Sequence, residues 1–242
     1  MKIVATKDYH VHSIFSDGHN TIEENVKQAV SLGLSEIGVS EHGFNHRRAG
    51  IKRDDLSKIK DEIMRVQAIY PQIKIKLGIE ANLLNLDGEV DLTESEAEGF
   101  DYIILGIHKL TWGKGVKGSL LFNCANFFSK GDKRAKKIAH SYELAFSRYP
   151  ITIVAHPNYA AQCDIELLLD SCKAHNVLFE LNRKNLDKIE QYARLICGSD
   201  TPLVMSSDAH ESRFVGDFSS QIEFVRKHNI NLDRIVNIKV VK

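Results

Sequence analysis

The feature that most constrains this chain of 242 residues is a repeated unit, in which an apolar stretch ends in a polar ligand type and a helical pattern follows. Strands that alternate with helices predict a parallel sheet covered by helices. Six of the seven strand candidates end in a histidine, glutamate or aspartate: His10 and His12, His42, Glu80, His108, His156, and Asp208 with His210. In a barrel of parallel strands the carboxyl ends converge on one face, so this pattern predicts a single site there.

The first and the last of these strands both end in a pair of possible metal ligands. His10 and His12 are two positions apart, as are Asp208 and His210. Residues i and i+2 of a strand point to the same face, so each pair is expected to project together. Converging imidazoles and carboxylates are typical ligands of a metal ion.

The remaining elements follow from periodicity and punctuation. The predicted strands are 8–12, 36–40, 73–80, 101–108, 151–156, 177–182 and the run that begins at Pro202, with a last short strand over 235–238. The predicted helices start near residues 22, 56, 132, 165, 186 and 221. Thr21 and Glu24 have capping-box spacing, and the Asp87-Gly88 pair predicts a hairpin turn over 85–90.

Composition sets the class of protein. Lysine plus arginine balances aspartate plus glutamate at 32 each, so no global field favours nucleic acid. The four cysteines are scattered without metal-site spacing, as expected of reduced thiols in a cytoplasmic protein. We find no signal-peptide core and no membrane span in the sequence. The whole of 1–242 is expected to form one domain.

Each candidate ligand also has a structural alternative. A lone His108 or His156 is more often a core histidine, Glu80 alone fits a capped turn, and Asp208 alone fits a helix N-cap. One metal site explains all these placements together and is therefore the preferred interpretation. The other histidines are interpreted as surface residues, with His19 and His46 as candidates for a pocket rim.

These motifs resemble the PHP (polymerase and histidinol phosphatase) family. The resemblance covers essentially the whole chain and rests on motifs in family order: His-x-His with Ser-Asp-Gly, Glu-His, Gly-Ile-Glu, Gly-Ile-His, Ala-His-Pro and Ser-Asp-Ala-His. It implies a distorted seven-stranded (β/α) barrel, similar to a TIM barrel, with two or three divalent metal ions. Glu41 departs from the family pattern, which usually has aspartate before the histidine.

The resemblance also implies which residues bind the metals. His10, His12, Glu80 and Asp208 would hold the first ion, and they form the expected catalytic set. Glu80, His108 and His156 would hold the second, with Glu80 as the bridge. Asp17, His42 and His210 would hold the third. Such mixed ligands suit zinc, manganese, iron or cobalt.

The chemistry expected of such a centre is phosphate ester hydrolysis by a metal-bridging hydroxide. Arg183, Lys109 and Arg47 are candidates for binding the substrate, because arginine in particular grips phosphate bidentately. Solvated loop charges are the alternative for each of them. The basic cluster Lys130, Lys133, Arg134, Lys136 and Lys137 is interpreted as a solvated helix face, with an anionic partner as the alternative.

The leading hypothesis is a metal-dependent phosphatase that acts on a small phosphomonoester, as a histidinol phosphatase does. The alternative is a phosphodiesterase or 3′-exonuclease, although the neutral chain offers no extended strand-binding groove. A tyrosine-phosphopeptide phosphatase is a third option within the family. A metal-bound scaffold without catalysis belongs to another class, and no ligand position is missing that would favour it.

Overall fold

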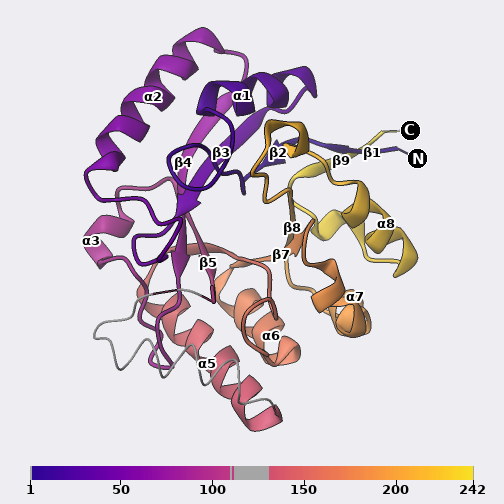
Figure 1. The fold of residues 1–242 in the computed structure, drawn as a ribbon. Coiled ribbons are helices and arrows are strands. Elements are labelled where there is room, and N and C mark those ends of the chain that lie inside the picture. The colour runs from indigo at the N-terminus through magenta and orange to yellow at the C-terminus, as the bar shows by residue number, and fades with distance from the viewer. Residues whose placement is uncertain (1, 110, 112–130, 242) are drawn as a thin grey trace.

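The computed structural model describes residues 2–109, 111 and 131–241, which leaves Trp112 and Lys130 outside the described residues. Its centre is a sheet of parallel strands whose spatial order, β2-β3-β4-β5-β6-β7-β8, is the order of the chain (Figure 1). These strands are β2 (Lys7–Asp8), β3 (Glu36–His42), β4 (Lys74–Asn82), β5 (Tyr102–Gly106), β6 (Ile151–Val154), β7 (Leu178–Asn182) and β8 (Leu203–Ser206). Sequential parallel neighbours are what a strand–helix repeat produces.

The sheet curls until its two edge strands meet beyond their carboxyl ends. Val11, after β2, forms a parallel bridge with Ala209, after β8. The backbone N–H of His12 donates to the Ala209 carbonyl at 2.9 Å, and the N–H of Ala209 donates to the His10 carbonyl at 3.2 Å. The seam therefore closes only at the end of the sheet where the predicted ligands lie, which confirms the expected distorted (β/α)7 barrel.

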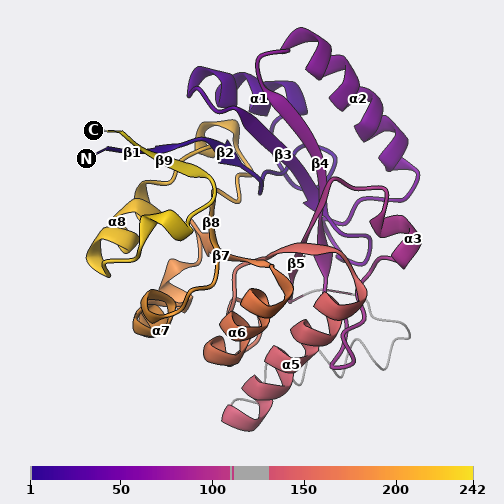
Figure 2. The ribbon, with the colours of Figure 1, turned by 180° about the vertical axis from the view of Figure 1, so that it is seen from behind.

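A second, two-stranded sheet joins the ends of the described chain. β1 (Lys2–Ala5) pairs antiparallel with β9 (Ile238–Val241), and the ends marked N and C lie side by side in Figures 1 and 2. The last strand therefore lies later in the chain than the predicted range 235–238. Ile235 makes only an isolated bridge to Leu203, and regular pairing starts where β1 becomes available.

The helices surround the curled sheet (Figure 2). They are α1 (Ile22–Ser31), α2 (Asp55–Ile69), α3 (Glu94–Ala97), α5 (Asp132–Arg148), α6 (Ile165–His175), α7 (Ala193–Gly198) and α8 (Ser219–Lys227). The predicted capping box is present, since the Thr21 side chain accepts from the N–H of Glu24 and the Glu24 side chain accepts from the N–H of Thr21. Of the basic cluster at the start of α5, Lys133, Lys136 and Lys137 are exposed.

Two local predictions need correction, and a third is confirmed in part. The helix predicted over 186–196 is broken into two 3₁₀ turns, Leu186–Lys188 and Glu190–Tyr192, before α7 begins. The hairpin predicted at Asp87-Gly88 is present but short, with one antiparallel bridge between Leu83 and Val90 and a hydrogen bond from the Leu84 N–H to the Glu89 carbonyl. The opening strand is short, because after Asp8 its own carboxylate accepts the N–H of His10 in place of a ladder partner. Such competition from side chains is common for aspartate.

The two faces of the sheet bury different side chains. Alternate residues of β5 face opposite sides, so that Ile103 and Leu105 belong to the large core under the helices. Tyr102 and Ile104 instead belong to a small inner cluster with Ile153, Ala155, Val204 and the partly buried Tyr9 and Leu178. The Tyr102 hydroxyl donates to the Tyr9 carbonyl at 2.6 Å. This inner layer fills the barrel, and Glu80 pairs in register with Ile104 and faces the same interior.

The cysteines that the structure describes agree with the expectation of reduced thiols. Cys163 and Cys172 are buried and Cys197 is partly exposed, and all three are free. Burial raises the pKa of the Cys163 and Cys172 thiols above the ordinary value. Cys124 lies outside the described residues.

Candidate metal centre

The predicted ligands gather where the parallel strands end. His42 and Glu80 lie in the last part of β3 and β4 and are register partners. His108, His156 and Asp208 follow β5, β6 and β8, while His10 and His12 follow β2. Asp17 comes from the loop between β2 and α1, which folds back towards the barrel as expected of the Asp17-Gly18 turn. His210 completes the set at the barrel mouth.

Glu80 is the centre of the arrangement. Its side chain is fully buried among five imidazoles. Oε1 lies 2.7 Å from His156 Nε2, 3.1 Å from His108 Nε2 and 3.3 Å from His10 Nε2. Oε2 lies 2.8 Å from His42 Nδ1 and 3.6 Å from His12 Nε2. A carboxylate shared in this way fits the expected bridging role of Glu80.

The other two carboxylates link the centre to the surface. Asp208 Oδ1 lies 3.6 Å from His12 Nε2 and 3.4 Å from His210 Nδ1. Asp17 Oδ1 lies 3.3 Å from His42 Nε2 and 3.2 Å from His210 Nε2. The side chain of Asp17 is 42% exposed and that of Glu80 is 0% exposed, so the cluster runs from a buried floor to an open mouth.

Ligand atoms approach within 4.8 Å of one another in three groups: His12, Asp17, His42 and His210; His10, His12 and Asp208; and His42, Glu80 and His108. The group with Asp17 contains the three ligands expected for the third ion. The group with Asp208 contains the ligands expected for the first ion, apart from Glu80. His42 takes the place that the resemblance assigned to His156 beside Glu80 and His108. His156 remains in hydrogen-bond contact with Glu80.

The hydrogen bonds around the cluster show which imidazole nitrogens face inwards. A carboxylate oxygen can only accept, so His10 Nδ1, 2.7 Å from Glu180 Oε1, carries a proton, and Nε2 is the nitrogen left to bind a metal ion. His108 Nδ1 likewise donates to Asn82 Oδ1 at 2.7 Å, because the Asn82 amide nitrogen donates to Asp91. When both imidazoles are neutral, the Nε2 atoms of His10 and His108 face Oε1 of Glu80 as lone pairs, and such electron-rich atoms repel unless a cation lies between them.

Unpartnered atoms at the centre support the same conclusion. His10 Nε2 and both nitrogens of His12 are buried without a hydrogen-bond partner, and His42 Nδ1 and Glu80 Oε2, although 2.8 Å apart, do not meet in hydrogen-bond geometry. Buried polar groups are nearly always satisfied, so a cluster of such atoms requires an explanation. Imidazole and carboxylate donors are the set that zinc, manganese and iron accept. The residues present therefore fit divalent transition metal ions.

Burial and mutual charge set the protonation of the centre. Burial raises the pKa of Glu80, but His108, His10 and His42 outweigh it and hold that pKa well below the ordinary value. Burial lowers the pKa of His42, but Glu80 and Asp17 overcome it and raise the pKa to about 10. Burial and the neighbouring His42 lower the pKa of His12. The carboxylates thus remain ionised and available as ligands.

Two of the predicted ligands have a backbone in the left-handed region. The φ angles are 29° at His156 and 50° at Asp208, which non-glycine residues rarely adopt. Such a conformation costs on the order of 1–3 kcal/mol and persists where the surroundings impose it. Both residues lie two positions after the end of a strand, where the chain turns at the edge of the cluster.

Glu180 is a residue of the site that the sequence analysis overlooked. It is fully buried, binds His10 Nδ1, and accepts the backbone N–H of His156 at 2.7 Å. It therefore orients ligands from two strands. The sequence did contain a signal for Glu180. The predicted strand 177–182 was the one candidate strand without a predicted ligand at its end, yet Glu180 and Asn182 lie there at positions i and i+2.

Glu41 and Asp91 support the cluster from two other sides. Glu41 accepts hydrogen bonds from the side chains of Ser13 and Ser16 and thereby holds the loop that leads to Asp17. Asp91 accepts from the Asn82 amide at 2.6 Å and so fixes the orientation of the side chain that binds His108.

The candidates for substrate binding are placed differently from one another. Arg183 Nε donates to the Ser207 carbonyl at 3.1 Å, and its guanidinium lies 4.2 Å from the Phe214 ring. Lys109 Nζ lies 4.8 Å from the ring of Tyr159, which contacts His156. Arg47 lies in the turn after β3 and is exposed. All three therefore lie in segments next to the cluster.

His46 lies against the cluster, as expected of a residue at a pocket rim. Its ring stacks on His42 with centroids 4.6 Å apart and also meets the edge of His108. Burial and the neighbouring His42 lower the pKa of His46 to about 4. His46 is therefore a neutral, half-buried wall of the cluster.

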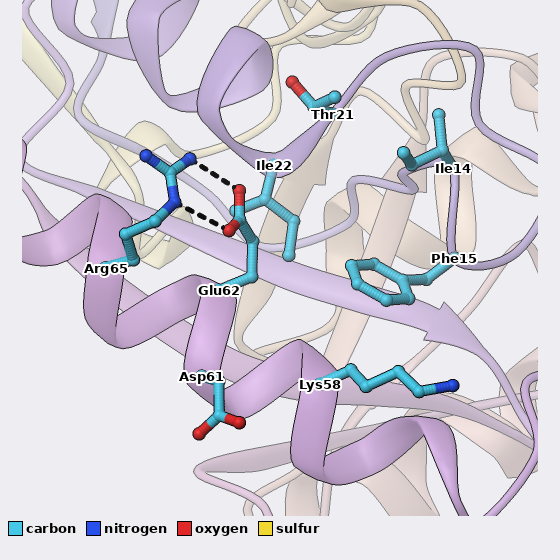
Figure 3. A pocket seen from close by; sticks show the side chains of 8 residues that line it. All are labelled: Ile14, Phe15, Thr21, Ile22, Lys58, Asp61, Glu62 and Arg65. Carbon is cyan, nitrogen blue, oxygen red and sulfur yellow. Dashed lines mark hydrogen bonds and ion pairs between the residues drawn. The ribbon is translucent and has the colours of Figure 1, made fainter.

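A groove of about 420 Å³ lies beside the loop that carries Asp17. Figure 3 shows Phe15 and Ile22 directed into it, between α1 and α2, with Arg65 paired to Glu62 at its edge. It is lined by Ile14, Phe15, Thr21, Ile22, Lys58, Asp61, Glu62 and Arg65. None of the predicted ligands lines this groove, so it is separate from the centre.

A distorted (β/α) barrel with imidazoles and carboxylates gathered at its strand ends defines a class of metal-binding barrel proteins. Comparison with known families agrees with the resemblance. The chain belongs to the PHP family, because the profile of the PHP domain matches residues 8–197.

Its relatives cover nearly the whole chain. A probable phosphatase of Aliivibrio fischeri is 25% identical, over 95% of this chain and 88% of that protein. The probable phosphatase YcdX of Escherichia coli is 22% identical, over 96% of this chain and 89% of that protein. Among solved structures, the histidinol phosphate phosphatase of Lactococcus lactis, complexed with zinc, L-histidinol and phosphate, has the same fold. Its TM-score is 0.59 at 19% identity, over 94% of this chain and 95% of that one.

Among the described residues, no helix has the length and apolar character needed to span a bilayer.

Proposed function

We propose that this protein is a metal-dependent phosphatase that hydrolyses a small phosphomonoester. The observation that carries the proposal is the convergence of His10, His12, Glu80, His108 and Asp208 with inward nitrogens that lack partners. Membership of the PHP family and the names of the relatives support the same reaction class. The Lactococcus lactis structure supports a substrate of the size of histidinol phosphate.

The residues expected to hold two or three ions are His10, His12, Asp17, His42, Glu80, His108, His156, Asp208 and His210. When bound, divalent ions supply Lewis acidity, which activates water and neutralises phosphoryl oxygens. Zinc, manganese and iron all fit the donor set.

The side chains of this protein prepare the centre for that chemistry. Glu180 and Asn82 hold the protons of His10 and His108 on Nδ1, so that both Nε2 atoms are directed inwards. The ring of His46 stacks on His42 and packs against the centre on that side. Asp17 and His210 are the more exposed members of the set, so the substrate enters at their side.

The test combines metal content with turnover. Elemental analysis is made on the purified protein, and hydrolysis of an aryl phosphomonoester is compared with that of the corresponding diester. We expect two to three ions and monoester turnover that is lost in His10→Ala. His140→Ala is the control, because His140 is exposed on α5.

Two outcomes would contradict the proposal. Diester turnover without monoester turnover would favour the phosphodiesterase or 3′-exonuclease alternative. A correctly folded protein that binds no metal and hydrolyses neither ester after reconstitution would leave a scaffold.

The expectation that 1–242 acts as one domain predicts that limited proteolysis yields no smaller stable fragment with bound metal.

A further inference from the structure

Lys184 is a cation in direct contact with the candidate metal centre. Its Nζ lies 3.1 Å from Asp208 Oδ1 and 2.8 Å from His210 Nδ1. Asp208 belongs to the group with His10 and His12, and His210 to the group with Asp17 and His42. The ammonium therefore stands between two of the three ligand groups.

The backbone holds Lys184 in this position. Lys184 follows β7, and its N–H donates to Asn182 Oδ1 at 2.9 Å. The amide nitrogen of Asn182 donates in turn to Asp208 Oδ2 at 3.2 Å. One side chain thus ties the turn that carries the lysine to the carboxylate that the lysine reaches. The lysine side chain is 37% exposed, so its ammonium is at the open mouth rather than in the floor.

The neighbouring cations are engaged in other ways. Arg183 is directed to the Phe214 ring and the Ser207 carbonyl. Lys109 lies over the Tyr159 ring on the side of His156. Lys184 is thus better placed than Arg183, its sequence neighbour, to reach a group bound on the side of Asp208 and His210.

Charge decides what Lys184 does when metals are present. If Asp208 binds a divalent ion, that ion neutralises part of the carboxylate's negative charge. The attraction between this carboxylate and the Lys184 ammonium then weakens. A lysine beside several cations is unfavourable unless an anion lies between them. A lysine has three donors on a flexible stem and can turn by a few ångströms to such an anion.

We propose that Lys184 binds the phosphoryl group of the substrate and makes the site selective for phosphomonoester dianions over diesters. The inference rests on the proposed function. A monoester carries a second negative charge and a third terminal oxygen, which a diester lacks. That additional charge is what an ammonium beside Asp208 and His210 recognises.

The test compares Lys184→Met with Lys188→Met, each loaded with metal and assayed for metal content. Lys188 is a fitting control because it is exposed in the same segment and forms an ion pair with Asp187 rather than with a predicted metal ligand. The first readout is the dissociation constant for inorganic phosphate, measured by calorimetry without turnover. The second is kcat/KM for an aryl phosphomonoester and for its diester.

We expect Lys184→Met to weaken phosphate binding about 10- to 100-fold, the usual effect of losing a hydrogen bond to a charged group. The kcat/KM for the monoester should fall by a similar factor and that for the diester by about threefold or less, with partial recovery in Lys184→Arg. Metal content should not fall.

Phosphate affinity in Lys184→Met equal to that in Lys188→Met would overturn the inference. So would a wild-type protein that binds no phosphate, or a loss of phosphate affinity that only follows a loss of metal. A wild-type protein that binds metal and phosphate but hydrolyses no monoester would refute the proposed function alone, since the phosphate measurement still reports on Lys184.

Discussion

Glu180 offers a sharp test of how the candidate metal centre is organised. Its Oε1 faces His10 Nδ1 at 2.7 Å, and its Oε2 accepts from the His156 N–H at 2.7 Å and from Asn182 Nδ2 at 3.0 Å. Glu180→Gln keeps the shape but replaces one oxygen by an NH₂ group. Because two donors already face the Oε2 position, the new NH₂ group must face His10.

The consequence is a change of tautomer at a predicted ligand. His10 Nδ1 must then accept a hydrogen bond, and the proton moves to Nε2, the atom that lies 3.3 Å from Glu80. A protonated nitrogen cannot bind a metal. Loss of such an orienting partner typically reduces metal affinity about 10- to 100-fold, which corresponds to about 1.4–2.7 kcal/mol.

The assay is competition for metal against a chromophoric chelator at neutral pH, with circular dichroism to establish folding. Glu143→Gln is the matched control, since Glu143 binds His140 Nδ1 at 3.0 Å in the same kind of pair on the exposed side of α5. Wild-type metal affinity in a folded Glu180→Gln protein would refute the assignment of Nε2 of His10 as a ligand atom.

Three further predictions concern stability and accessibility. Metal at about 100 times its dissociation constant should stabilise the fold by about 2.7 kcal/mol and raise the melting temperature by roughly 5–10 °C; differential scanning fluorimetry with and without chelator measures this, and no shift despite bound metal would contradict it. Gly78→Ala should destabilise the protein by about 1–3 kcal/mol, because its Cβ would lie 2.2 Å from the Tyr102 ring; urea unfolding that matches the wild type would contradict it. In a thiol-labelling experiment read by mass spectrometry, Cys197 should react in the native protein, whereas Cys163 and Cys172 should react only on unfolding, because burial keeps their thiols protonated and inaccessible. Native labelling of Cys172 would show that the core opens.

Much of the architecture could be predicted because it depends on local patterns. An apolar run that ends in His42, Glu80, His108 or His156 indicates, within a few consecutive residues, both a strand and a candidate ligand at its end. The parallel sheet then follows from the alternation with helices, since parallel strands need crossover connections. The convergence of the predicted ligand residues could be expected for the same reason, as the carboxyl ends of such strands meet on one face.

Other features depend on which groups become neighbours in three dimensions. Glu180 looks like an ordinary charged residue within a strand until the curled sheet places it against His10, which lies 170 positions away in the chain. The broken helix over 186–196 and the displaced last strand, β9, have the same origin, because packing and pairing partners overrode periodicity there.

The sequence by itself determined the order of strands and helices and the residue types at the strand ends, because backbone alternation and side-chain chemistry are local properties. Only the tertiary structure decided which nitrogen of His10 faces inwards, and that Lys184 rather than Arg183 reaches Asp208. Those outcomes depend on hydrogen bonds and charges between distant segments, and no spacing along the chain encodes them.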